Sequence, residues 1–145
     1  MPGALLDTHT LYWLVSGAAP LSDDALVSIG ENQAAGTLYV SPVTAWELAV
    51  AVQKTPAQGR PDLGGRSARS WFKDAIRLTG AKLIPVKQRI ALEAADVAAI
   101  YGRKDPGDCF LIATARVRRI PIVTRDRAML ALARTQPDYL SVVVA

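Results

Sequence analysis

The chain has 145 residues, of which 50% are hydrophobic and one is cysteine. This composition fits a single globular domain over residues 1–145 and excludes a disordered chain or a disulfide scaffold. No apolar run approaches the ~18 residues of a membrane span, and the first fifteen residues lack the basic start of a signal peptide, so we expect a cytoplasmic protein. The net charge is +4, but all seventeen Lys and Arg residues follow residue 53, whereas five of the thirteen acids precede it. This asymmetry favours a polyanionic partner over an unevenly charged but inert surface.

Short apolar runs alternate with helical patterns along the first half of the chain. Ser22 is a natural helix cap, and Ser41 followed by Pro42 is a strong helix start. The expected elements are a strand at 3–6, helices at 8–16 and 23–35, a strand at 37–40 and a helix at 42–53. Residues 55–70 are rich in Pro and Gly and lack periodicity, which predicts a long functional or mobile loop.

The second half continues the alternation. The expected elements are a helix at 69–78, a strand at 82–86, helices at 87–101 and 107–118, a strand at 120–124, a helix at 126–134 and a strand at 139–144. Buried strands that alternate with helices predict an α/β fold with a parallel sheet covered on both faces. In such folds the functional site lies at the carboxyl ends of the strands.

Four acids lie beside apolar segments: Asp7, Glu47, Asp108 and Asp126. Asp7 and Asp126 follow expected strands, and Glu47 and Asp108 lie on the apolar faces of helices. Each has a structural alternative as a helix cap, a capping-box acid or a first-turn acid. A carboxylate beside a core needs a partner, however, so four of them at one sheet edge predict a shared anionic pocket.

Neighbouring residues are expected to support this pocket. Thr8 and Thr124 lie next to its acids, and Thr124 could orient a carboxylate or a water. Asp105 begins the same helix as Asp108 and is expected mainly to cap it, facing outward. We expect His9 and Cys109 to be structural.

The available side chains suggest which metal the pocket would hold. The sequence has one histidine and one cysteine, so the usual nitrogen and sulfur ligands of zinc are missing. Oxygen ligands suit Mg²⁺ or Mn²⁺, which promote hydrolysis of phosphodiesters by activated water. Motifs for a covalent nucleophile, a P-loop or a dinucleotide site are absent.

Four segments in the order LLDTHTLYWLVSG, SPVTAWELAV, DPGDCFLIATA and IPIVTRD resemble the PIN-domain ribonucleases, above all VapC-type toxins of toxin–antitoxin pairs. The resemblance implies a three-layer α/β/α sandwich with a mostly parallel central sheet of about five strands. It implies a Mg²⁺ or Mn²⁺ site formed by Asp7, Glu47, Asp108 and Asp126. It also implies RNA endonuclease activity, a homodimer and inhibition by a VapB-type antitoxin in a heterotetramer or larger assembly.

The sequence departs from the family pattern around the third segment. Relatives often have His before the Asp-Pro pair and Arg after the next Asp, where this chain has Lys104 and Cys109. Other basic residues are therefore candidates for phosphate contacts. The candidates for RNA or antitoxin contact are Arg66, Arg69, Trp71, Lys73, Arg103 and Arg125. Trp13 and Trp46 are expected in the core or a dimer interface.

Three other functions would also use clustered acids in an α/β fold. An aspartyl phosphatase would want a second acid where His9 stands, and a phospho-receiver domain would carry a lysine near the last strand, which YLSVVVA lacks. A catalytically inactive PIN-like module that binds RNA or protein is the remaining alternative. The presence of all four acids argues against it.

Overall fold

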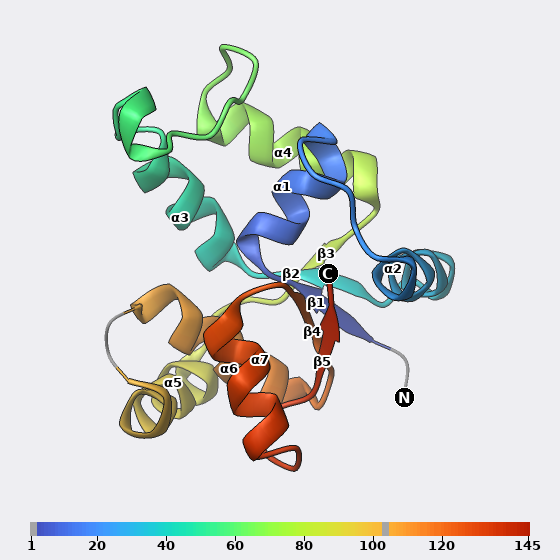
Figure 1. Ribbon diagram of the computed structural model, residues 1–145, viewed down its shortest axis with the longest axis vertical. Helices are drawn as coiled ribbons and strands as arrows, with labels where there is room; N and C mark the ends of the chain where they lie inside the picture. Colours follow the sequence, from blue (N-terminus) through green and yellow to red (C-terminus); the bar gives the residue numbers. More distant parts are fainter. Residues whose placement is uncertain (1–2, 103–104) are drawn as a thin grey trace.

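The structure, a computed structural model, describes residues 3–102 and 105–145 and contains one parallel sheet (Figure 1). The sheet has five strands in the order β3-β2-β1-β4-β5. Its strands are β1 (Ala4–Leu6), β2 (Leu38–Val40), β3 (Lys82–Leu83), β4 (Ile122–Thr124) and β5 (Val142–Val144). The helices are α1 (Thr8–Ser16), α2 (Asp23–Ala35), α3 (Pro42–Ala51), the 3₁₀ turn η1 (Pro56–Gln58), α4 (Ala68–Thr79), α5 (Gln88–Tyr101), α6 (Pro106–Arg118) and α7 (Arg127–Thr135).

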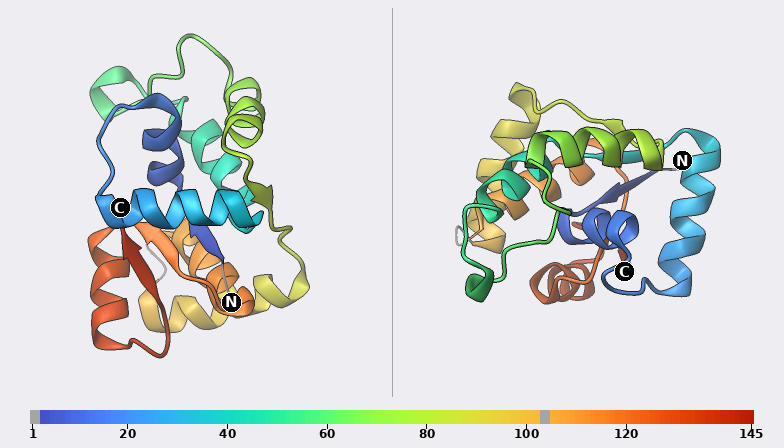
Figure 2. Two further views of the ribbon diagram at one scale, coloured as in Figure 1. Left: turned by 90° about the vertical axis from the view of Figure 1, so that its right-hand side faces the viewer. Right: turned by 90° about the horizontal axis from the view of Figure 1, so that it is seen from above.

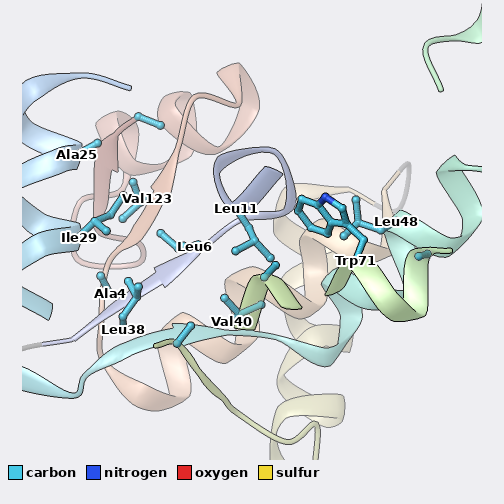
Figure 3. Packing of buried hydrophobic residues seen from close by; sticks show 14 of the residues in the cluster. Ala4, Leu6, Leu11, Ala25, Ile29, Leu38, Val40, Leu48, Trp71 and Val123 are labelled. Atoms are coloured by element: carbon cyan, nitrogen blue, oxygen red, sulfur yellow. The ribbon is translucent and has the colours of Figure 1, made fainter. Parts of the chain in front are cut away.

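Helices cover both faces of the sheet, as the views in Figures 1 and 2 show. Successive strand residues point to opposite faces. Leu6 therefore packs with α1–α4, whereas Leu5 packs with α5–α7. Figure 3 shows the first of these cores, in which Leu11 of α1 lies close to Trp71 of α4. The expected three-layer α/β/α sandwich with a five-stranded parallel sheet is confirmed.

Several strands are shorter than the sequence predicted. The strand expected at 82–86 ends at Leu83, although the N–H of Ile84 still donates to the carbonyl of Val40 at 3.1 Å. The strand expected at 120–124 begins only at Ile122, after Pro121. The predicted helix starts are found where expected, since Ser22 and Ser41 each accept a backbone hydrogen bond from the first turn.

The segment expected as a loop at 55–70 is held against the domain. It contains η1, and its Leu63 is buried. The Tyr12 hydroxyl donates to the carbonyl of Asp62 at 2.9 Å and accepts from the Asp62 N–H at 3.1 Å. The segment therefore has fixed anchor points on α1.

Strand order brings β1 and β4 side by side. From β1 the chain moves outward to β2 and β3, then returns to the other side of β1 to form β4 and β5. The crevice at the carboxyl ends of such a pair is the usual place for a site in open parallel sheets. Asp7 follows β1 directly, and Asp126 lies two residues beyond β4. Within the described ranges, no helix has the length and apolar character needed to cross a membrane.

Candidate functional site

A cavity of about 310 Å³ opens at the carboxyl edge of the sheet. All four acids singled out in the sequence line it, and a fifth acid, Asp105, joins them. They come from four places in the fold, namely the end of β1, the helix α3, the start of α6 and the start of α7. Its other lining residues are Thr8, His9, Trp13, Leu111 and Arg125.

Asp7 and Asp126 are joined through the hydroxyl of Thr124. Asp7 is only 5% exposed, and its Oδ2 accepts from Thr124 Oγ1 at 2.5 Å. The same Oγ1 accepts from the backbone N–H of Asp126 at 3.0 Å. Thr124 is buried at the end of β4, so this hydroxyl fixes the spacing between the two acids across the β1–β4 crevice.

The same two acids also cap helices. Asp7 Oδ1 accepts from Thr10 N at 2.9 Å at the start of α1, and Asp126 Oδ1 accepts from Met129 N at 2.9 Å at the start of α7. The capping role and the place in the cavity are therefore not alternatives. One oxygen of each carboxylate satisfies a helix N-terminus, which orients the rest of the group.

Glu47 reaches the cavity from the second turn of α3. Thr8 Oγ1 donates to Glu47 Oε1 at 2.5 Å and lies 3.1 Å from the hydroxyl of Thr44. The end of the Glu47 side chain rests on the backbone of Gly107, where an added Cβ would lie 2.6 Å from Oε2. Burial raises the pKa of Glu47 above its ordinary value, and the nearby Asp105 and Asp7 carboxylates act in the same direction.

Glu47, Asp105 and Asp108 offer carboxylate oxygens that all lie within 4.8 Å of one another. Asp105 caps α6 by accepting from Asp108 N at 3.1 Å, as the sequence predicted. The sequence predicts a mainly structural, outward-facing Asp105. Its side chain is exposed, but the structure gives it a share in the acidic cluster as well.

Asp108 is the acid whose protonation is most altered. Burial raises the pKa of Asp108 to about 7, and neighbouring carboxylates contribute to this rise. The contributing acids are Asp105, Asp126 and Glu47. A carboxyl group that resists ionisation in the metal-free protein is one that a cation would readily deprotonate.

Tyr101 is a residue of this cavity region that the sequence analysis missed. Its hydroxyl lies 2.9 Å from Asp108 Oδ2 and 3.3 Å from Asp126 Oδ1. Burial and these two carboxylates raise the pKa of Tyr101 well above its usual range, so the hydroxyl remains a donor. A signal was present, because Tyr101 continues the buried stripe of Ala94 and Val97 along α5.

No positive side chain pairs with these acids among the described residues. The ion pairs found there join Arg66 and Arg77 to Asp74, and Arg116 to Glu93. Arg125 lines the cavity, but its guanidinium stacks over the Trp13 ring at 4.3 Å and donates to the carbonyls of Ala145 and Pro20. An all-oxygen set of unpaired carboxylates is the donor set that Mg²⁺ or Mn²⁺ prefers, so the residues fit such an ion.

The remaining candidate contact residues lie in different surroundings. Arg69 and Lys73 line an apolar groove between α3 and α4, whereas Arg66 is held by Asp74 and Ser70. Trp71 requires a correction, since it is 6% exposed and packs beside the Tyr12 ring, which leaves it little surface for RNA or antitoxin.

Two further residues were predicted, Trp46 and Arg103. Trp46 is 55% exposed on α3, so it is not part of the core. Arg103 lies outside the described residues.

Comparisons with known proteins agree with this architecture. The family model described as PIN domain matches residues 4–135. No curated protein matches the chain.

Solved structures match over nearly their whole length and that of this chain. A toxin–antitoxin complex from Klebsiella pneumoniae is 21% identical, with 98% of this chain and 97% of that chain covered and a TM-score of 0.59. The VapBC-5 member of the VapBC family of toxin–antitoxin systems from Mycobacterium tuberculosis is 21% identical, with both chains fully covered and a TM-score of 0.61. VapBC2 from Rickettsia felis, bound to a DNA fragment from its promoter, is 13% identical, covers 97% and 96%, and has a TM-score of 0.65. At these identities the likeness concerns the fold.

Proposed function

This chain belongs to the PIN domain family, and from that premise we propose that it is a metal-dependent endoribonuclease, the toxin component of a type II toxin–antitoxin pair. The proposed reaction is hydrolysis of an RNA phosphodiester bond by activated water. The proposed catalytic and metal-binding residues are Asp7, Glu47, Asp108 and Asp126, with Thr8, Thr124 and Asp105 in support.

One observation carries the proposal. Five carboxylates share one cavity, and no Lys or Arg side chain forms an ion pair with them within the described ranges. Like charges so close together are unfavourable unless some are protonated or a cation lies between them. Burial raises the pKa values of Glu47 and Asp108 in the metal-free protein, and the neighbouring carboxylates raise them further.

The proposed roles follow from the contacts of each acid. Asp108 and Glu47 would hold Mg²⁺ or Mn²⁺ together with Asp105, since their oxygens already lie within mutual reach. Asp7 and Asp126 would complete the set, and the Thr124 hydroxyl joins them by donating to Asp7 and accepting from the Asp126 N–H. A bound ion would supply positive charge to the phosphodiester and acidify a water that attacks phosphorus.

The charge distribution supports RNA as the substrate. All Lys and Arg residues follow residue 53, and Arg69 and Lys73 both line the groove between α3 and α4. Basic residues of this kind would bind the RNA backbone without reading its sequence. Arg125 is a further candidate because it lines the acidic cavity itself.

The proposed partners are a VapB-type antitoxin and a second copy of the chain. The structural neighbours from Klebsiella pneumoniae and Mycobacterium tuberculosis are described as toxin–antitoxin systems. Trp46 and Val50 leave apolar surface exposed on α3, which is compatible with a homodimer or a larger complex with antitoxin. We place this activity in the cytoplasm.

The test is RNA cleavage by the purified chain. Total RNA would be incubated with the protein and Mg²⁺ or Mn²⁺, beside a reaction with EDTA and one with Asp108→Asn. Cleavage that both controls abolish is expected, and mapped cut sites would identify the target. Calorimetric titration with Mn²⁺ provides a readout that does not depend on finding the right RNA.

Two results would contradict the proposal. Cleavage that persists in EDTA would remove the metal from the reaction. A folded protein that neither cleaves RNA nor binds Mn²⁺ would favour the alternative, a catalytically inactive PIN-like module that binds RNA or protein.

A further inference from the structure

The hydroxyl of Tyr101 ties together three segments that are separate in the sequence. Tyr101 is the last residue of α5, Asp108 lies in the first turn of α6 and Asp126 caps α7. The hydroxyl lies within hydrogen-bond distance of both carboxylates, at 2.9 Å from Asp108 Oδ2 and 3.3 Å from Asp126 Oδ1. It is the contact that links Asp108 to Asp126 among the hydrogen bonds of the described residues.

The tyrosine ring is held in place independently of these acids. It packs, partly buried, against the core between α5–α7 and the sheet, which includes Ile112 and Met129. A hydroxyl on a ring fixed in this way has a defined position, so it can set the positions of flexible carboxylates rather than follow them. The two acids would otherwise repel each other with no donor between them.

The contacts of Tyr101 leave one carboxylate oxygen of Asp108 and one of Asp126 available. Tyr101 engages Oδ2 of Asp108, and the Met129 N–H and Tyr101 share Oδ1 of Asp126. Neither Asp108 Oδ1 nor Asp126 Oδ2 has a hydrogen-bond partner within residues 3–102 and 105–145. Each carboxylate is thus fixed through one oxygen, while the other stays free in the region of the cavity that both acids line.

We propose that Tyr101 is a positioning residue of the acidic site, whose hydroxyl sets the spacing and rotation of Asp108 and Asp126 so that their free oxygens can bind one divalent cation. This inference rests on the proposed metal-dependent function. It adds to that function a residue outside the acidic set, from a helix that contributes none of the acids. Tyr101 acts through the two carboxylates and touches neither the cation nor the RNA.

The Tyr101 hydroxyl could also have the opposite effect on metal binding, by competing with the cation. A hydroxyl that occupies carboxylate oxygens could compete with the cation, and its removal would then strengthen metal binding. The free oxygens described above favour positioning, because the hydroxyl does not have to leave for a cation to bind. Removal of the hydroxyl therefore distinguishes the two effects by the direction of the change.

The experiment compares Tyr101→Phe with Tyr12→Phe and the unchanged chain. Tyr12→Phe removes the same atom from another partly buried tyrosine, but its hydroxyl bonds to the backbone of Asp62 rather than to an acid of the cavity. Mn²⁺ alone is the probe, with binding followed by calorimetry and by the electron paramagnetic resonance spectrum of the ion. Circular dichroism checks that each variant is folded.

We expect Tyr101→Phe to weaken Mn²⁺ binding about tenfold and to alter the resonance spectrum, while Tyr12→Phe leaves both unchanged. In RNA cleavage, kcat should fall without a matching rise in KM. Unchanged or stronger Mn²⁺ binding by a folded Tyr101→Phe would overturn the positioning role and leave the proposed function standing. Absence of Mn²⁺ binding by the unchanged chain would overturn both.

Discussion

Gly107 is the point at which the backbone of α6 limits the position of Glu47. A Cβ on Gly107 would lie 2.6 Å from Glu47 Oε2 and 2.7 Å from its Cδ, distances at which something must shift. The atoms that would shift belong to the far end of a flexible side chain, and Gly107 has no left-handed backbone angle that alanine would strain. Gly107→Ala should therefore push the Glu47 carboxylate out of the cavity and leave the helix in place.

The effect on stability should be small because two contributions oppose each other. Alanine in place of glycine favours a helix by about 0.5–1 kcal/mol. Displacement of Glu47 breaks its 2.5 Å hydrogen bond from Thr8, at a cost of about 1–2 kcal/mol. The free energy of unfolding should change by less than about 1.5 kcal/mol.

Gly107→Ala should change the affinity for metal more than it changes the free energy of unfolding. Disturbing the groups that orient metal ligands typically costs 10–100-fold in affinity, and removing a ligand from reach should cost at least about as much. We therefore expect Gly107→Ala to weaken Mn²⁺ binding by about 10–100-fold, or about 1.4–2.8 kcal/mol. Cleavage of RNA should fall with it.

Calorimetric titration with Mn²⁺ and urea denaturation together test this reasoning. Gly30→Ala in α2 is the matched control, since a Cβ there meets nothing within 4 Å; it should stabilise the protein slightly and leave Mn²⁺ binding unchanged. In a Glu47→Ala background, Gly107→Ala should cause no further loss of affinity. Full Mn²⁺ affinity in a folded Gly107→Ala protein would refute the idea that Glu47 must lie against α6 to bind the ion.

Three further predictions concern other parts of the site. Because the pKa of Asp108 is raised to about 7, the metal-free protein should lose stability as pH rises from about 4 to 7, by about 1–2 kcal/mol after solvent screening. Urea denaturation of Asp108→Asn should show a flatter pH dependence of stability. An unchanged pH dependence would mean that another group causes the loss. Thr124→Val should leave the buried oxygen of Asp7 without its donor and lower the free energy of unfolding by about 1–3 kcal/mol, measurable as a lower urea midpoint. A midpoint equal to that of the unchanged chain would show that the Thr124 hydroxyl does not stabilise the fold. Charge reversal at Arg69 and Lys73 together should weaken RNA binding and flatten its dependence on salt by about 0.7 per lost phosphate contact; an unaltered salt slope would remove this groove from the RNA surface.

Much of the fold could be predicted because its signals are local. Ser22 and Ser41-Pro42 mark helix starts through chemistry within one turn, and the structure has both. The strand ends were less accurate, since the hydrophobic run at 82–86 does not show which of its residues pair with β2, and β3 ends at Leu83. The order of the strands depends on contacts far apart in the sequence and was not predicted.

The acidic site could be predicted only in outline. Asp7 and Asp126 follow strands, which directs them to one edge of the sheet, but an acid that begins a helix looks the same whether or not it also enters a cavity. Asp105 is the example, because its capping role is visible in the sequence and its nearness to Glu47 is not.

Two aromatic residues show how such errors arise. Trp71 was expected at the surface because basic residues surround it, although its spacing to Ala68 and Ala75 matches the buried face of α4. Tyr101 was overlooked because its partners, Asp108 and Asp126, lie on other elements.

Three of the five acids serve as N-caps, so three helices begin at the rim of the same cavity. Asp7 begins α1, Asp105 begins α6 and Asp126 begins α7. The N-terminus of each helix carries a partial positive charge and unsatisfied N–H groups, both of which stabilise a nearby carboxylate. The backbone thus offsets part of the repulsion that basic side chains offset elsewhere in the protein.

Under the proposed function, folding would therefore not depend on metal binding. In a zinc finger the ion is needed to form the structure, so that removing it unfolds the chain. Here the helix starts hold the acidic residues before any ion arrives, and a chelator should take the ion away without taking the structure with it. Under the proposed function, the protein would stay folded and inactive without the ion, and its activity would follow the supply of divalent cation reversibly.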